Sequence, residues 1–393
     1  SRSSGWSVVS TSDHASAPHG SGTDHADANV IAGAAGDAAT DDPDGSADAA
    51  TDNPHDTGDA VDPAGKRALW KRIAIWVAAV LGALLLIVLA MALWPASTSG
   101  LGSDPDPASG YDDAVERFAE LTGDEADLVY EPCESVLMDH GERVEVAVVL
   151  FHGLTNCPKQ FVDFAETLHA DGANVLILRA PRHGIANADG SGIGSLSNIA
   201  GLDAAELRDF ADDSVDIAVG LGDEVRVLGL SMGGVLAEWT AQHRDDVDRV
   251  VPVAPAMSIP GVPGFLTSGF VNLFDKLPNI DLPGESNLDH AYVGESTEGL
   301  VATFLLARSV EDDAEEVGPA AGEVIVVINP DDNQVDPGYV SSFASEWNER
   351  AGNVAIVELP AVGLPHDVID PDQPEGNPEL VYPILFDLLA NGS

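Results

Sequence analysis

The stretch "VRVLGLSMGGVLAEW", residues 225–239, decides how the chain is organised. It opens with apolar and β-branched residues, the composition of a buried strand. Ser231 then stands between Gly229 and Gly233, and a helix-forming pattern follows at once. The stretch therefore predicts a strand, a sharp turn and a helix in immediate succession, with a serine at the turn.

The same alternation continues over much of the chain. Strands are predicted at 144–151, 174–178, 224–229, 249–254, 323–328 and 354–359, and helices at 159–170, 203–219, 233–243, 339–351 and 378–389. Asp203, followed by Glu206, has the pattern of a capping box. Near-continuous apolar strands separated by helices indicate a mostly parallel, doubly wound α/β sheet covered on both faces. We expect this domain over residues 111–393, where "ESVLMDHG" (134–141) is the only candidate for an earlier strand.

Residues 256–320 interrupt the alternation between two predicted strands. They are long for a loop and contain apolar clusters such as "GFLTSGFVNLF" (264–274). Connections of this length are more often functional insertions than slack chain. We therefore expect an insertion with a role of its own.

The composition is strongly acidic throughout. Acidic residues number 66 against 17 basic ones, giving a formal net charge of −49, which argues against nucleic acid as a partner. Residues 95–393 alone hold 54 acidic and 12 basic residues, so the excess is not confined to a tail. Molar salt shortens the Debye length to about 3 Å and screens such repulsion. The composition is typical of a halophile's protein.

The N-terminal part predicts a tail and a membrane span. Residues 1–65 consist largely of Asp, Ala, Gly, Ser, Thr and Pro, and we expect them to be disordered. Residues 73–94 form an uncharged run of 22, long enough to cross a hydrocarbon core of about 30 Å. We expect a transmembrane helix within 66–94 and a linker at 95–110.

Charges flanking the run predict its orientation. Four basic residues precede it, and none follows until Arg117. The positive-inside rule then places the N-terminus in the cytoplasm and the α/β domain outside the cell membrane. The alternative is a cleaved signal peptide, because Ala90-Met91-Ala92 resembles a processing site. The apolar run is, however, longer than the usual 7–15 residues.

Cys133 and Cys157 both follow the predicted membrane helix, in what should be a non-reducing compartment. They are candidates for a disulfide that closes a loop of 24 residues, worth about 3 kcal/mol in the chain-entropy model. The alternative is two free, buried thiols.

Ser231 has the setting of a nucleophile. Gly-Leu-Ser-Met-Gly between a strand and a helix is the nucleophile-elbow pattern, in which Gly229 and Gly233 are needed because side chains there would collide. In "VLFHGLTNCP" (149–158), Gly153 lets the chain turn so that the backbone N–H groups of Leu154 and Met232 face one point. Two such donors form an oxyanion hole.

An acid and a base follow in chain order. "INPDDNQVDP" (328–337) offers Asp331, Asp332 and Asp336, of which we choose Asp332, since the acid of such a site lies in the loop after this strand. His366, in "VGLPHDV" (362–368), is the only histidine beyond that loop. The order Ser, Asp, His is the one expected of this architecture.

Residues 130–390 resemble the α/β-hydrolases, and within them the carboxylesterase and monoacylglycerol-lipase-like branch. The resemblance rests on five stretches: "VVLFHGLTNCPKQF", "NVLILRAPRHG", "VLGLSMGGVLAEW", "INPDDNQVDP" and "LPHDV". It implies a serine hydrolase with the triad Ser231, Asp332 and His366, a cap at 256–320, and a small-molecule ester or lipid substrate. It implies no metal or organic cofactor.

Two other functions stay open. The same fold serves peptidases and thioesterases, since the fold does not decide the substrate. A catalytically silent surface-binding protein is the third reading, against which the complete set of three residues argues.

Overall fold

The computed structural model describes residues 63–284 and 286–392. The predicted tail, 1–65, falls almost entirely outside them. Helix α1 (Pro63–Leu93) contains a stretch, Gly65–Leu93, that is long and apolar enough to cross a membrane. None of its most apolar window is buried in the protein, which argues against a helix of the soluble core.

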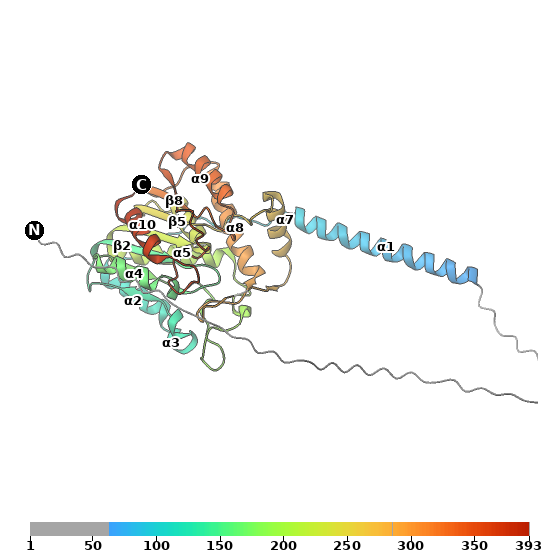
Figure 1. Ribbon diagram of the computed structural model, residues 1–393, viewed down its shortest axis with the longest axis horizontal. Helices are drawn as coiled ribbons and strands as arrows, with labels where there is room; N and C mark the ends of the chain where they lie inside the picture. Colours follow the sequence, from blue (N-terminus) through green and yellow to red (C-terminus); the bar gives the residue numbers. More distant parts are fainter. Residues whose placement is uncertain (1–62, 285, 393) are drawn as a thin grey trace, which may run out of the picture. The chain divides into compact units, whose positions relative to one another are not determined.

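A seven-stranded sheet forms the centre of the α/β domain (Figure 1). All neighbouring strands are parallel except the first pair, β1 and β3. In spatial order the strands are β1 (Val136–Met138), β3 (Asn174–Ile177), β2 (Val144–Phe151), β4 (Gly222–Leu230), β5 (Arg249–Val253), β8 (Glu323–Ile328) and β9 (Val354–Glu358). The predicted doubly wound sheet is confirmed, and the candidate at 134–141 is the short edge strand β1.

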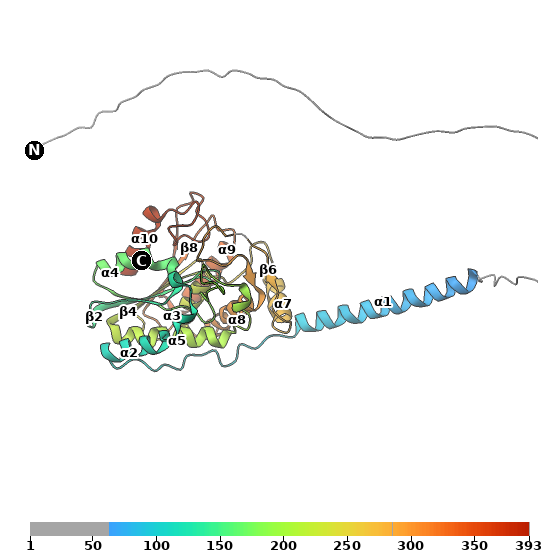
Figure 2. The same ribbon diagram turned by 90° about the horizontal axis from the view of Figure 1, so that it is seen from below.

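Helices cover both faces of the sheet, as Figure 2 shows from below. One face packs against α4 (Val162–Ala170) and α10 (Pro378–Asn391). The other packs against α5 (Ala204–Leu221), α6 (Met232–His243), α8 (Thr297–Ala314) and α9 (Pro337–Ala351), with α2 (Tyr111–Thr122) against α5. Short α3 (Glu125–Leu128) follows α2. Asp203 and Glu206 form the predicted capping box at the start of α5.

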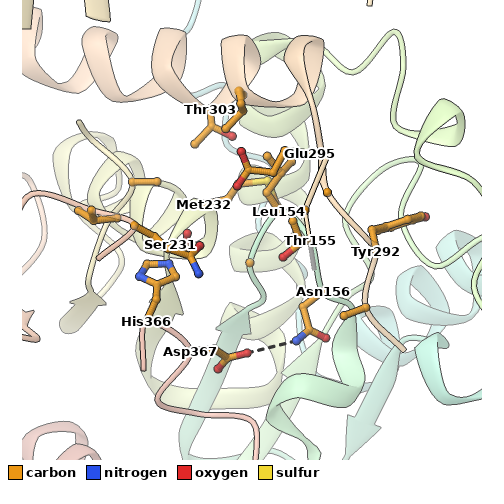
Figure 3. Close-up of a pocket in the computed structure, with 18 of the residues that line it drawn as sticks. Leu154, Thr155, Asn156, Ser231, Met232, Tyr292, Glu295, Thr303, His366 and Asp367 are labelled. Carbon is orange, nitrogen blue, oxygen red and sulfur yellow. Dashed lines mark hydrogen bonds between the residues drawn. The ribbon is translucent and has the colours of Figure 1, made fainter. Parts of the chain in front are cut away.

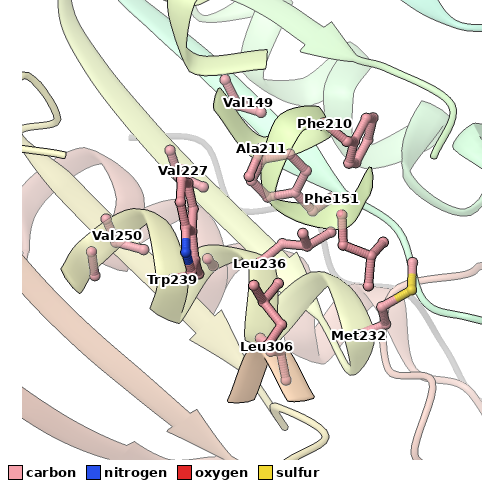
Figure 4. Close-up of a cluster of buried hydrophobic side chains, with 14 of the residues drawn as sticks. Val149, Phe151, Phe210, Ala211, Val227, Met232, Leu236, Trp239, Val250 and Leu306 are labelled. Carbon is pink, nitrogen blue, oxygen red and sulfur yellow. The ribbon is translucent and has the colours of Figure 1, made fainter. Parts of the chain in front are cut away.

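The larger core cluster lies between the sheet and α5, α6 and α8 (Figure 4). Its centre is Trp239 of α6, which has no exposed surface, packed in one cluster with Val227 of β4 and Leu306 of α8. Burying an aromatic side chain of this size contributes several kcal/mol, since truncation to Ala costs about 3–5 kcal/mol. This packing fixes α6, and therefore its first turn, against the sheet.

The insertion between β5 and β8 contains α7 (Gly264–Phe274), the two-stranded hairpin β6 (Asp281–Leu282) and β7 (Glu295–Ser296), and α8. The two halves of α8 differ. Leu300, Thr303 and Phe304 line a pocket, whereas Leu306 and Val310 belong to the main core. Helix α8 therefore belongs partly to the pocket wall and partly to the main core.

Two further features tie down the chain ahead of β2. Residues 95–110, the predicted linker, contain no helix or strand but pack against the domain. Leu101 is buried, and its carbonyl accepts a 2.6 Å hydrogen bond from Nε1 of Trp239. Cys133 and Cys157 form the disulfide that the sequence analysis favoured, with Cα atoms 5.2 Å apart.

Candidate active site

Ser231 occupies the turn between β4 and α6, with φ 61° and ψ −115°. A positive φ is uncommon for a residue with a side chain and stores strain. A Cβ atom on Gly229 would overlap the backbone of Gly233, and one on Gly233 would overlap the carbonyl of Phe151. The turn is thus packed too tightly for side chains at either glycine position, and Ser231 is held at the carboxyl edge of the sheet.

A pocket of about 720 Å³ opens above this turn. That volume lies within the range of small-molecule sites, about 300–1,000 Å³. Ser231, Met232, Leu154 and His366 all line it, as Figure 3 shows. The insertion supplies much of the remaining wall, including the apolar side chains Ile259, Phe270, Leu282, Leu300 and Phe304. The pocket therefore combines reactive groups at its floor with apolar surface above them.

His366 is oriented by Asp332. Its Nδ1 lies 2.7 Å from Asp332 Oδ2, while Oδ1 of the same carboxylate accepts hydrogen bonds from the backbone N–H groups of Gln334 and Val335. Burial raises the pKa of Asp332, but the hydrogen bonds from His366 and the backbone outweigh it, so the pKa lies below its ordinary value. Asp332 is therefore ionised, and Nδ1 of His366 donates to it.

This leaves Nε2 as the nitrogen of His366 that is available to Ser231, beside which the ring lies in Figure 3. No hydrogen bond joins the two side chains in the described part of the chain, and such bonds are often long before substrate binds. The other two candidate acids have different partners. Asp331 accepts from the N–H of Gly363, and Asp336 caps α9.

The loop after β2 fixes the direction of the N–H of Leu154, because hydrogen bonds hold the carbonyl of Gly153 at the other side of the same peptide. The carbonyl of Gly153 accepts from Nδ1 of His152 at 2.9 Å and from the N–H of Asn156 at 3.2 Å. A trans peptide is planar, so its N–H points opposite to its carbonyl. The N–H of Leu154 therefore points away from these donors. It donates to no other residue in the described chain, nor does that of Met232.

The tautomer of His152 follows from its partners. Its Nε2 accepts from the N–H of Ala180 at 3.0 Å, so the proton must be on Nδ1, facing the carbonyl of Gly153. Burial lowers the pKa of His152 to about 3, which keeps the ring neutral. His152 thus holds the peptide of Leu154, a role that its place in "HG" did not reveal.

Comparisons with known proteins find relatives of this chain and solved structures with a similar fold. A family model described as serine aminopeptidase, S33, matches residues 142–297. A thermostable monoacylglycerol lipase of Bacillus sp. (strain H-257) is 26% identical over 207 residues, which are 51% of this chain and 75% of that lipase. The structure of a monoacylglycerol lipase of Paleococcus ferrophilus aligns with a TM-score of 0.50 at 17% identity, covering 66% of this chain and 98% of that one.

A structure from a study of LipS and LipT, two metagenome-derived lipolytic enzymes, aligns equally well, with a TM-score of 0.50, 18% identity and coverage of 66% and 98%. The chain has the fold of the α/β-hydrolases. Among proteins with this fold, it is similar to lipases and esterases.

The site also contains polar groups that sequence reasoning missed. Glu295 of β7 lines the pocket, where burial raises the pKa of its carboxyl by more than the charge of His366 lowers it, so the pKa lies above its ordinary value. Asn156, Gln160, His290, Asp367 and Asp370 form a buried cluster, of which Asn156, Gln160 and Asp367 also line the pocket. The one available signal was local, since "NCPKQ" and "HDVID" place polar residues in otherwise apolar surroundings. Among the described residues, no group of three His, Cys, Asp or Glu side chains has the arrangement of a metal site.

Proposed function

We propose that this α/β-hydrolase is a serine hydrolase that cleaves carboxylic esters, with Ser231, His366 and Asp332 as its triad. The observation that carries the proposal is the 2.7 Å bond from His366 to Asp332 in a pocket that Ser231 also lines. A base oriented by a carboxylate beside a serine at a strained turn is the arrangement of an activated nucleophile.

The proposed reaction proceeds in two halves. His366 takes the proton of Ser231 Oγ as that oxygen attacks the ester carbonyl, and the N–H groups of Leu154 and Met232 stabilise the oxyanion. His366 then protonates the departing alcohol, leaving an acyl group on Ser231. A water molecule, deprotonated by His366, attacks this acyl group, releases the acid and restores the serine.

A lipid ester is the substrate class that the surroundings of the pocket favour. Asn272 of α7 donates to the carbonyl of Ala92 in α1 at 3.0 Å and accepts from the N–H of Ala96 at 3.0 Å. On the same helix, Phe270 lines the pocket, whereas Phe265 is 75% exposed. One apolar helix therefore contacts both the end of the proposed anchor and the substrate pocket.

We accordingly propose an uncleaved, single-pass anchor through residues 73–94, with the α/β domain outside the cell membrane. The Cys133–Cys157 disulfide supports an extracytoplasmic domain, because such bonds persist in oxidising compartments. The monoacylglycerol lipases similar to this chain make a single-chain acylglycerol the first substrate to test.

Peptide hydrolysis is the second candidate, because the matching family model is described as a serine aminopeptidase. A panel of acylglycerols and p-nitrophenyl esters, run beside aminoacyl anilides in molar KCl, separates the two. Faster turnover of the anilides would reject the ester hydrolase.

The first prediction concerns the triad. A fluorophosphonate probe should label the wild type and not Ser231→Ala. Asp332→Asn should lower kcat on the order of 10⁴-fold, because His366 loses the partner that fixes its tautomer. The matched control is Asp331→Asn, whose carboxylate bonds Gly363 instead and should leave kcat nearly unchanged. An unlabelled, folded wild type would refute the proposal and favour a silent binding protein.

A further inference from the structure

Five buried polar side chains form a cluster at the wall of the pocket, none of them more than 8% exposed: Asn156, Gln160, His290, Asp367 and Asp370. They come from three separate parts of the chain, namely the loop after β2, the insertion, and the loop that carries His366. Burying polar groups costs free energy unless they are hydrogen bonded. Their hydrogen bonds show what the cluster holds together.

Asp367, the residue after His366, is the centre of the cluster. Its Oδ1 accepts from the backbone N–H groups of Ile369 and Asp370, each at 3.1 Å. Its Oδ2 accepts from Gln160 Nε2 at 2.7 Å and from Asn156 Nδ2 at 3.3 Å, the latter drawn in Figure 3. All four partners donate and none accepts, which favours the charged carboxylate, although burial and the nearby charge of Asp370 raise the pKa of Asp367 above its ordinary value.

Gln160 joins this carboxylate to the loop that carries the Leu154 donor. Its Oε1 accepts from the N–H of Gly153 at 2.9 Å while its Nε2 donates to Asp367. An N–H can only donate, so the orientation of the amide is fixed by its two partners. One side chain thus connects the residue before Leu154 with the residue after His366.

The cluster extends to the insertion. Asn156 Nδ2 also donates to Asp370 Oδ2, which His290 of the insertion contacts through Nε2 at 2.6 Å. Burial lowers the pKa of His290, but the hydrogen bonds and charges of Asp370 and Asp289 outweigh it and raise the pKa overall. His290 is therefore favoured as a cationic donor to Asp370.

We propose that Gln160 and Asp367 are positioning residues. They hold the loop after β2, which carries the N–H of Leu154, at a fixed position relative to His366, and Asn156, Asp370 and His290 extend this connection to the insertion. The inference rests on the proposed function, since it assigns the two loops their roles as donor and base. Gln160 and Asp367 both line the pocket, but neither forms a hydrogen bond with Ser231 or His366 in the described chain. Their contribution is to hold Leu154 and His366 at the spacing that the transition state needs.

The test uses the full-length protein with Gln160→Glu, Asp367→Asn and the double variant. Gln160→Glu places two acceptors face to face, and Asp367→Asn places two donors face to face. We expect each single variant to lower kcat about 10- to 100-fold and to change KM less than about 3-fold, because small displacements of reacting groups cost up to about 10² in rate. In the double variant the new amide donates to the new carboxylate. We expect it to recover at least about half of the loss, on a logarithmic scale.

Rates are expressed per active site, titrated with the fluorophosphonate probe, so that unfolded protein is not counted. The matched control is Asn174→Asp in the first residue of β3, at the end of the sheet away from the pocket. The Asn174 amide is equally buried and donates to the carbonyls of Glu142 and Leu221. It should lower the melting temperature without changing kcat per site. Single variants with wild-type kcat, or a double variant no faster than the slower single, would overturn the inference. A folded wild type that the probe does not label would refute the proposed function instead.

Discussion

Glu238 of α6 carries a carboxyl group that is buried away from water. Its side chain has no exposed surface, and neither carboxyl oxygen has a hydrogen-bond partner among the described residues. Burial raises the pKa of Glu238 well above its ordinary value, and the charge of Glu311 adds to the effect. A carboxyl group so placed avoids the cost of a buried charge by keeping its proton.

The second prediction follows from this raised pKa. The native state keeps the Glu238 proton to a higher pH than the unfolded chain does, so stability is lost as the pH rises above the unfolded value of 4.5. Glu238→Gln removes the titration, and its advantage over the wild type should widen as the pH rises. Urea unfolding at several pH values measures this difference. Exposed Glu349→Gln is the control, and an advantage independent of pH would contradict the assignment.

At the scale of single residues, the sequence predicted those candidate site residues that have a recognisable local sequence pattern. Ser231 follows from its strand, glycines and helix, and His366 from its place after the acidic loop. The choice among Asp331, Asp332 and Asp336 depends on how the loop turns, which spacing alone does not encode. Gln160 and Asp367 could not be found, because their bond spans 207 positions and neither residue type signals it.

At the scale of elements, the loops after β2, β4, β8 and β9 meet at one edge because parallel strands end there together. The insertion is attached to this edge through the ion pair between His290 and Asp370. A buried, charge-assisted hydrogen bond of this kind contributes about 1.5–3 kcal/mol. The pair therefore couples the stability of the insertion to pH.

The third prediction concerns this pair. The folded-state pKa of His290 lies above its ordinary 6.5, so the stabilisation is fully present below pH 6.5 and is lost as the pH rises through the folded value. His290→Gln should be less stable than the wild type at pH 6, and the difference should shrink at pH 9. Denaturant titrations at both pH values measure it. Exposed His140→Gln should show no such trend, and a constant gap for His290→Gln would rule out the charged pair.

Most elements were predictable because their signals are local. Apolar runs marked the parallel strands, and Asp203 with Glu206 marked the start of α5. The edge strand β1 gave a weak signal, since its three residues are only partly buried and pair with a strand later in the chain. The division of α8 between pocket and core depends on its packing against α6, which periodicity does not reveal.

Across the whole molecule the dominant quantity is negative charge, −49 in formal terms. Most of the few basic residues of the domain form ion pairs with carboxylates. Arg244, 1% exposed, donates to Asp212, Asp216 and Asp246. Such pairing leaves most surface acids facing one another across water. We therefore expect the stability of the domain to depend on dissolved ions that weaken this repulsion.

The fourth prediction is a strong salt dependence of stability. The Debye length falls from about 10 Å at 0.1 M salt to about 3 Å at 1 M, so the melting temperature should rise steeply over that range of KCl. Replacing the exposed acids of α2 in Asp112→Asn/Glu116→Gln/Glu120→Gln should reduce the dependence. Calorimetry of both proteins against KCl concentration provides the measurement. A melting temperature that is flat or falling with KCl would exclude a halophilic domain.

The packing of α8 limits the routes by which the proposed substrate could reach Ser231. Leu306 and Val310 hold this helix in the interior of the domain, so it cannot swing aside without breaking that interior apart. The first turns of α8 consequently form a fixed part of the pocket wall. Under the proposed function, a bulky ester would enter past the part of the insertion that precedes α8, which contributes Ile259 and Phe270 to the pocket wall, and the shape of that entrance would select which esters reach Ser231.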